Sequence, residues 1–418
     1  MSAPEIPSPN ADVRMRGFAQ RATVEAATAW IDSVLPAFSA LPATQVALSV
    51  ASGCILATDI ISPVNVPGFS RSMMDGFAVR GEDTYGATAY NPLSLRIRGT
   101  CLPGKSFPGT LVTGEALRIM TGAPLPAGAD AVLPVEQTEL DGLQVLARGE
   151  VSTGKHVAQV GEDIRADECV LRAGRQLRPQ DLGVLSSIGV SQVSVIRPPR
   201  VRILITGNEL LPAGTPPDGF RIADANGPML SALVMRDGGE VAASDMILDD
   251  PQSIREALLS PAEIILVSGG SSVGVEDHAP RLLAEEGELA IHGIAMRPSS
   301  PAGMGRLSGR LVFLLPGNPV SCLCAYDFFA GRAIRALAGR STAWPYRQIR
   351  GTLVRKLVST VGRVDYARVQ VRGDDVEPLA ISGASILSST TRADGFVIVP
   401  ADSEGYPPGA EVNVFLYG

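Results

Sequence analysis

Three glycine-rich segments in the second half of the chain carry the hydroxyls and free backbone amides that an anion-binding site needs. They read "ILITGNEL", "ILVSGGSSVGVEDHAP" and "VFLLPGNPVSC". In open parallel sheets, ligands sit beyond the carboxyl ends of the strands, where backbone N–H groups attract phosphate and other oxyanions. A single loop of this kind could simply be a tight turn, but three in one sheet favour a ligand site. The candidate binding residues are Thr206, Gly207, Gly269, Gly270, Ser271, Ser272, Gly274, Pro316, Gly317 and Asn318.

Three carboxylates, Glu209, Asp224 and Asp277, lie in or near the same segments. Mg²⁺ takes oxygen ligands, and few of them need come from the protein when phosphates are present. We therefore predict these three acids as metal ligands and catalytic residues. The alternative for any single aspartate is a helix cap or a turn hydrogen bond. The Walker pattern and G-x-G-x-x-G after a strand are absent from the sequence, which disfavours an ordinary kinase or dehydrogenase.

Apolar strands must position these loops. Residues 201–206, 263–268 and 311–315 are nearly continuous apolar runs, and helical patterns such as "NGPMLSALVMRDGG" and "PQSIREALLS" lie between them. This alternation predicts a parallel sheet covered by helices on both faces, within an α/β domain spanning about 199–340. Pro319 suits the first turn of a helix, so the Gly317–Asn318 amides could face a ligand.

The flanking regions have different patterns. Residues 24–35 predict an amphipathic helix, with Thr23 as its N-cap and Pro36 as its stop. From about 50 to 198, short β-like runs are cut by Gly and Pro without crossover helices, which favours antiparallel β modules. After 340 the sequence returns to alternating strands, enough for a small β-barrel or sandwich. The fold class is therefore multidomain, α/β plus β.

Composition excludes several classes of partner. The formal net charge is −7 and the basic residues form no run, so the sequence lacks the basic cluster that is typical of nucleic-acid-binding proteins. The five cysteines and three histidines are scattered, which makes a His/Cys metal site improbable. No apolar run reaches the roughly 18 residues of a membrane helix. We expect a cytoplasmic protein that acts on a small molecule and has no membrane partner.

Seven ordered motifs carry a resemblance to a known family. They are "SRSMMDGFAVR", "IMTGAPLPAGADAV", "VGEDI", "ITGNELL", "SGGSSVGVEDH", "LPGNPVSCLCAYDFF" and "GASILSSTTRADGFVIVP". In this order they resemble the molybdopterin molybdotransferase family, which includes bacterial MoeA and the C-terminal domain of gephyrin. The resemblance covers nearly the whole chain. It implies an enzyme that inserts molybdate into adenylylated molybdopterin, releasing AMP and giving molybdenum cofactor, with Mg²⁺ assisting.

The resemblance also implies an architecture and further site residues. It implies an elongated homodimer with an inter-subunit active site, and molybdopterin adenylyltransferase and apo-molybdoenzymes as further partners. The further catalytic residues that it implies are Asp75, Thr121 and Asp163. Asp75 would extend across the cleft between two subunits; the alternative is that it caps a local turn. The implied domains are I (1–62 and 164–198), II (β-rich, 63–163), III (molybdopterin-binding, 199–340) and IV (β-barrel, 341–418).

Some ligand-facing positions depart from the family pattern. Arg297 and Ser300, in "MRPSSPAGMG", stand where the family typically has the basic stretch K-P-G-K-P. We predict both as cofactor-binding residues, although Ser300 offers only a neutral hydrogen bond. Further departures are Ala158 for an arginine, Asn208 for an aspartate, and His278 with Ala279 for Tyr-Thr. Two alternatives therefore stay open: a non-catalytic paralogue that binds or delivers molybdopterin, and a molybdopterin adenylyltransferase.

Overall fold

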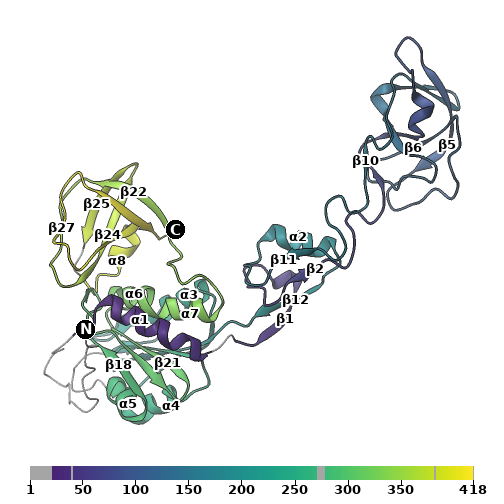
Figure 1. The fold of residues 1–418 in the computed structure, drawn as a ribbon. Helices are drawn as coiled ribbons and strands as arrows, with labels where there is room; N and C mark the ends of the chain where they lie inside the picture. Colours follow the sequence, from purple (N-terminus) through teal and green to yellow (C-terminus); the bar gives the residue numbers. More distant parts are fainter. Residues whose placement is uncertain (1–20, 39–40, 271–277, 381–382, 418) are drawn as a thin grey trace, which may run out of the picture. The chain divides into compact units, whose positions relative to one another are not determined.

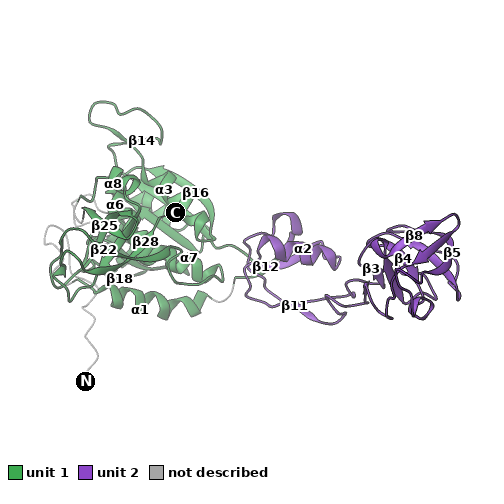
Figure 2. Ribbon diagram, turned by 90° about the horizontal axis from the view of Figure 1, so that it is seen from above, with its two compact units in different colours: residues 1–44, 196–418 green, residues 45–195 purple. Residues whose placement is uncertain are grey.

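The computed structural model describes residues 21–38, 41–270, 278–380 and 383–417 (Figure 1). The chain divides into two compact units: unit 1 comprises 1–44 with 196–418, and unit 2 comprises 45–195 (Figure 2). None of the helices in the described residues is both long and apolar enough to span a membrane. The four-domain division stays a prediction.

Unit 1 contains the predicted α/β domain, built on a six-stranded sheet. In sheet order the strands are β16 (Glu240–Ile247), β13 (Arg200–Thr206), β17 (Ile264–Ser268), β21 (Arg310–Leu315), β20 (Gly303–Leu307) and β18 (Glu288–His292). The first four are parallel, whereas β20 and β18 are antiparallel additions at one edge. The three apolar runs are thus confirmed as adjacent parallel strands, and Val201, Ile264 and Leu311 stand side by side in register.

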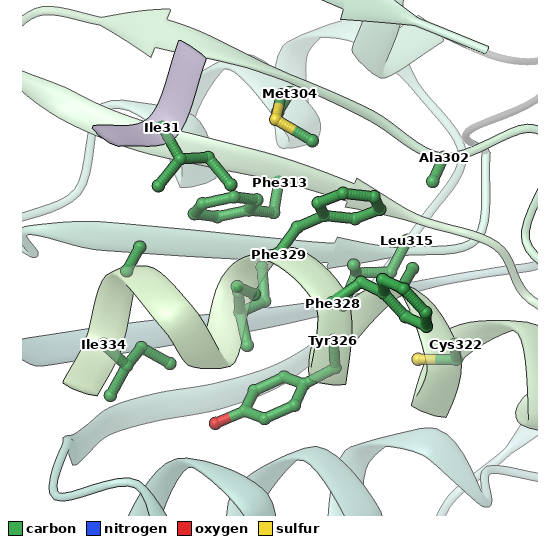
Figure 3. Close-up of a cluster of buried hydrophobic side chains, with 14 of the residues drawn as sticks. Ile31, Ala302, Met304, Phe313, Leu315, Cys322, Tyr326, Phe328, Phe329 and Ile334 are labelled. Carbon is green, nitrogen blue, oxygen red and sulfur yellow. The ribbon is translucent and has the colours of Figure 1, made fainter. Parts of the chain in front are cut away.

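Helices cover both faces of this sheet, as the continuous apolar runs predict. One core contains the alternate residues Ile203 and Phe313 and packs against α1 (Val24–Val34), α3 (Asn226–Arg236), α6 (Pro319–Ala325) and α7 (Gly331–Leu337) (Figure 3). The other contains Leu204 and Ile265 and packs against α4 (Pro251–Leu258) and α5 (His278–Glu286). The N-terminal helix is confirmed, and the Thr23 hydroxyl accepts a hydrogen bond from the Ala26 N–H at 3.1 Å.

The C-terminal part of unit 1 is a closed five-stranded barrel. Around the barrel the order is β24 (Val364–Arg372), β25 (Asp375–Ala380), β22 (Arg347–Leu353), β28 (Glu411–Leu416) and β26 (Gly395–Val399), with β26 pairing back onto β24. Its other elements are β23 (Leu357–Val358), β27 (Gly405–Tyr406) and α8 (Ser388–Arg392). The short strand β19 (Met296–Arg297) pairs with β24 and joins the barrel to the α/β domain.

Unit 2 is β-rich, as predicted, around a second six-stranded sheet. In sheet order its strands are β7 (Ala131–Pro134), β4 (Gly76–Val79), β6 (Glu115–Ile119), β5 (Leu93–Cys101), β9 (Gln144–Ala147) and β8 (Thr138–Asp141). Three short pairs accompany it: β3 (Arg71–Ser72) with β10 (Val157–Ala158), β2 (Ile60–Ile61) with β11 (Cys169–Leu171), and β1 (Ala43–Ala47) with β12 (Gln192–Ile196).

The expectation of antiparallel β modules is wrong for one pair of strands, and the sequence analysis also missed one helix. Strands β5 and β6 are parallel, because the Gly- and Pro-rich connection 102–114 carries the chain back without a helix. Helix α2 (Pro179–Ser187) begins with a proline at its first position. Asp181 fixes its first turn by accepting the Arg178 N–H at 2.9 Å. A nine-residue helix is too short for hydrophobic periodicity to stand out from its neighbours.

Candidate functional site

The three predicted loops meet at the carboxyl edge of the parallel strands. Gly269 has φ +98°, and a Cβ atom there would lie 2.2 Å from the carbonyl oxygen of Thr206. Its N–H donates to the Leu315 carbonyl at 3.2 Å. On the other side, a Cβ atom at Gly317 would lie 3.6 Å from the Cα of Gly269. Only glycine fits at position 269, so this residue brings the first and third loops together.

Asn226, which the sequence reasoning missed, ties the same loops to helix α3. Its Nδ2 donates to the Ser268 hydroxyl at 2.9 Å and to the Gly317 carbonyl at 2.7 Å. The side chain is 7% exposed, and its Oδ1 is buried without a hydrogen-bond partner among the described residues. The Thr206 hydroxyl is in the same condition. Buried polar atoms are normally paired, so both atoms are available for a ligand or for neighbouring chain: the Thr206 hydroxyl can donate or accept, whereas the Asn226 Oδ1 can only accept.

Asp224 has the local capping role that we considered as an alternative. Its Oδ1 accepts the N–H groups of Asn226 at 2.8 Å and Gly227 at 3.0 Å, at the start of α3. A carboxylate has about four acceptor positions, so oxygen lone pairs remain for another partner.

Glu209 and Asp224 flank a segment that we call the β14–β15 arm, residues 210–223, and Glu209 is exposed. The paired strands β14 (Leu210–Leu211) and β15 (Ile222–Ala223) form the base of this arm, and the loop at β14 projects from unit 1 in Figure 2. The Ile222 N–H donates to the Glu209 carbonyl at 3.0 Å, and the Asp224 N–H donates to the Leu211 carbonyl at 2.9 Å. These two hydrogen bonds hold the segments that carry the two acids side by side.

Part of the predicted site lies outside the described residues. These positions are Ser271, Ser272, Gly274 and Asp277. Among the residues that the structure describes, no group of three His, Cys, Asp or Glu side chains could hold a metal ion. Glu209 and Asp224 therefore remain as two candidate carboxylates.

Arg297 forms an internal ion pair. Its Nε and Nη2 approach the two carboxylate oxygens of Asp365 at 3.1 and 2.5 Å, and Asp365 is fully buried. The Ser359 hydroxyl donates to the same carboxylate at 2.7 Å. The guanidinium thus links the α/β domain to the barrel, and only its other N–H donors could reach a phosphate. The Ser300 hydroxyl is buried, without a hydrogen-bond partner in the described chain.

The third loop is capped by the barrel. Helix α6 begins at Pro319, as predicted. The Ser385 hydroxyl donates to the Asn318 Oδ1 at 3.0 Å, and the Val320 N–H donates to the Ala384 carbonyl at 2.9 Å. One amide of the first helical turn is therefore satisfied by the protein, while Gly317 and Asn318 stay exposed and Pro316 is buried.

In unit 2, the structure brings Asp75 and Thr121 together although they are 46 residues apart. The exposed Asp75 carboxylate accepts the Thr121 N–H at 2.7 Å and the Thr121 hydroxyl at 2.8 Å, both on Oδ1. These two bonds, with a smaller contribution from the Arg118 charge, lower the pKa of Asp75. Both bonds fall on Oδ1, so the second oxygen, Oδ2, keeps its capacity to accept a proton, a cation or a metal ion. Asp163 is exposed at a turn, where its N–H donates to the Val66 carbonyl at 3.0 Å.

Replacing Gly269 with alanine should destabilise unit 1 by about 3 kcal/mol or more, because the methyl group meets the Thr206 carbonyl in a left-handed backbone. The matched control is Gly214→Ala, at φ +78° with nothing within 4 Å of the added Cβ. It should cost only about 1 to 2 kcal/mol. Urea unfolding of both variants checks this, and equal losses would contradict the close packing of the loops.

Replacing Thr121 with valine should raise the pKa of Asp75 toward its ordinary value, because one of the two lowering hydrogen bonds is lost. A lowered pKa keeps the carboxylate charged as the pH falls. Any activity that needs this charge should therefore disappear at a higher pH in the variant than in the wild type. The pH dependence of turnover measures this. Thr138→Val, whose hydroxyl donates only to the Val135 carbonyl at 2.8 Å, is the control. An unmoved acid limb in Thr121→Val would contradict the prediction.

Family models match three successive parts of the chain. Residues 22–189 match the MoeA N-terminal region (domain I and II), residues 202–336 match a domain described as "Probable molybdopterin binding domain", and residues 350–417 match the MoeA C-terminal region (domain IV). The fold and the strand-end loops thus define a protein of the molybdopterin-binding α/β class.

Relatives and a solved structure extend over nearly the full length. A molybdopterin molybdenumtransferase 2 of Mycobacterium tuberculosis is 34% identical over 88% of this chain and 94% of its own length. A molybdopterin molybdenumtransferase of Staphylococcus aureus is 31% identical over 90% and 92%. A crystal structure of a molybdopterin biosynthesis MoeA protein from Pyrococcus horikoshii has a TM-score of 0.81 at 31% identity, covering 96% of this chain and 100% of that one. The chain belongs to the MoeA family.

Proposed function

We propose that this chain is a molybdopterin molybdotransferase in molybdenum cofactor biosynthesis. It inserts molybdate into adenylylated molybdopterin and releases AMP. The observation that carries this proposal is the meeting of the strand-end loops around Gly269, with the buried Thr206 hydroxyl unpartnered among the described residues and able to donate, at a sheet edge of the type that binds anionic ligands. The names of the full-length relatives support the same reaction.

The substrates require two kinds of protein group. Amide and hydroxyl donors are needed to bind a pyrophosphate linkage and a tetrahedral oxyanion. Cleavage of the linkage also needs carboxylates that bind a cation and transfer protons. In our proposal, the loops at Gly207, Gly269 and Gly317 bind the substrate. Asp75, Thr121, Asp163, Glu209, Asp224 and Asp277 are the catalytic residues.

Mg²⁺ would neutralise charge on the pyrophosphate. Glu209 and Asp224 suit it, because Mg²⁺ is commonly bound by one or two carboxylates with waters and phosphate oxygens completing the shell. The pair at the base of the β14–β15 arm meets that requirement, and the capping bonds of Asp224 leave it acceptor capacity. Asp277 is proposed as the third ligand.

We also propose that the active site is shared within a homodimer. Asp75 belongs to unit 2, whereas Glu209 and Asp224 belong to unit 1. In the proposed assembly, unit 2 of one copy supplies Asp75 to a substrate bound on unit 1 of the other copy. A molybdopterin adenylyltransferase would supply the adenylylated substrate, and apo-molybdoenzymes would receive the product.

One observation favours a second candidate, a non-catalytic paralogue that binds or delivers molybdopterin. Arg297 forms an ion pair with Asp365, and Ser300 has a buried hydroxyl in place of a charged group. This segment therefore offers little positive charge for binding phosphate. Each lost charge-assisted hydrogen bond costs about 1.5 to 3 kcal/mol. The adenylyltransferase alternative has less support, because the N-terminal and C-terminal MoeA regions both match this chain.

One assay separates the candidates. Purified protein is incubated with adenylylated molybdopterin, Mg²⁺ and molybdate, and both AMP release and reconstitution of an apo-molybdoenzyme are followed. The molybdotransferase should release AMP only when molybdate is present. Tight binding of the substrate without AMP release would select the paralogue.

A further inference from the structure

Arg118 is the exposed residue of strand β6, whose other residues are buried. Its neighbours Leu117 and Ile119 belong to one core of unit 2. Because Arg118 pairs in register with Phe77 of β4, which lies in the core of the opposite face, the arginine shares that opposite face. On its other side Arg118 pairs with the exposed Thr100 of β5. A guanidinium and a hydroxyl therefore stand side by side at the margin of a packed sheet.

The same pairing brings Arg118 close to Asp75. Asp75 comes directly before β4, and its carbonyl accepts the Val135 N–H at 3.2 Å. Its carboxylate accepts two hydrogen bonds from Thr121, which follows β6. Asp75 is thus held at the end of the β4–β6 ladder, diagonal to Arg118, and a long side chain can span that diagonal. The two Thr121 hydrogen bonds lower the pKa of Asp75, and the Arg118 charge adds to this effect.

The guanidinium of Arg118 has no hydrogen bond or ion pair within the part of the chain that the structure describes. Two other arginines of the same sheet region are paired locally, Arg98 with Glu115 and Arg148 with Glu139. A guanidinium carries five N–H donors in a planar fork that matches the oxygens of phosphate and carboxylate groups. The donors of Arg118 are therefore available to a ligand.

We propose that Arg118 binds an oxyanion next to Asp75, with the Thr100 hydroxyl as a second donor. A charged carboxylate repels a phosphate or molybdate anion, and a neighbouring guanidinium offsets this repulsion. The anion is a phosphate group of the adenylylated substrate or of its AMP product, or molybdate. This inference rests on the proposed function, because it adds a binding residue that brings the substrate to Asp75.

Residue-resolved labelling of the full chain tests the proposal. Phenylglyoxal modifies accessible guanidinium groups, and mass spectrometry of the peptides gives the modification rate of each arginine. AMP, inorganic pyrophosphate and molybdate are added singly, without Mg²⁺. At least one probe should slow the modification of Arg118 about tenfold near saturation. Protection by AMP or pyrophosphate alone assigns the site to phosphate, protection by molybdate alone assigns it to the metal oxyanion, and protection by both kinds assigns it to oxyanions in general.

Arg148 is the control within the same sample, since its guanidinium is exposed and belongs to the same unit. Its modification rate should not respond to the probes. In Asp75→Asn, half-protection of Arg118 should need about two- to fivefold less probe, because a like charge beside the anion is removed. The proposal is overturned if no probe protects Arg118, if Arg148 is protected equally, or if Asp75→Asn needs as much probe as the wild type. An arginine that only neutralises Asp75 would give the first of these results.

Turnover separates this inference from the proposed function. Arg118→Gln should raise the KM for the adenylylated substrate about tenfold or more with a smaller change in kcat, as expected for a lost charge-assisted hydrogen bond. A wild-type KM in Arg118→Gln would overturn the inference alone. Protection of Arg118 in a protein that releases no AMP would overturn only the proposed function.

Discussion

Replacing Asp75 with asparagine should lower the rate of AMP release by about 10²- to 10⁴-fold, the usual contribution of a positioned acid or base. The amide oxygen of asparagine can still accept the two hydrogen bonds from Thr121. The loop should therefore keep its geometry while it loses the negative charge. Single-turnover AMP release and circular dichroism of the same sample separate a lost reaction from a lost fold.

Asp130 offers a matched control in unit 2. Its carboxylate accepts the Gly81 N–H at 2.7 Å and the Thr153 hydroxyl at 3.2 Å, much as Asp75 accepts from Thr121. Asp130→Asn should therefore affect stability slightly and turnover hardly at all. A wild-type rate in Asp75→Asn, or an equal loss in Asp130→Asn, would refute the assignment of Asp75 to the reaction.

The second large effect is expected on stability. Asp365→Asn should destabilise unit 1 by about 3 to 5 kcal/mol, because it removes one partner of a buried ion pair. The fully buried Asp365 carboxylate forms an ion pair with Arg297 and accepts a hydrogen bond from the Ser359 hydroxyl. In the variant, both groups would lose their charged acceptor. Thermal and urea unfolding measure the loss. Because Arg297 joins the α/β domain to the barrel, we expect the barrel to unfold first.

Glu139→Gln is the control for this prediction. Glu139 pairs with Arg148 at 3.2 Å, and both side chains are about half exposed. Such surface pairs contribute about 0 to 1 kcal/mol. A loss in Asp365→Asn no larger than that of Glu139→Gln would mean that the buried pair does not hold the two parts together.

The sequence predicts the α/β domain well because its signals are local. Each central strand is a continuous apolar run that ends at a glycine loop, and Thr23 and Pro319 mark helix starts by their own chemistry. The parallel pairing of β5 with β6 has no such signal. It depends on how the connection 102–114 packs, because a short β-like run does not indicate whether its strand pairs parallel or antiparallel with a neighbour.

The candidate site was predicted only in part, for a related reason. Thr206, Gly269 and Gly317 follow apolar runs and could be found from sequence. Asn226 could not, because its partners Ser268 and Gly317 lie 42 and 91 residues away. The role of Arg297 was likewise hidden, since its pairing with Asp365 depends on where the barrel folds back onto the α/β domain.

Mixing two inactive variants tests most directly whether acids of both units act on one substrate across a subunit boundary. Asp75→Asn and Glu209→Gln, each inactive alone, are co-expressed with different tags, and the purified heterodimer is assayed for AMP release. If the site is shared between subunits, we expect about half of the wild-type activity, because one of the two sites then carries neither substitution. A heterodimer as inactive as its parents would contradict a shared site.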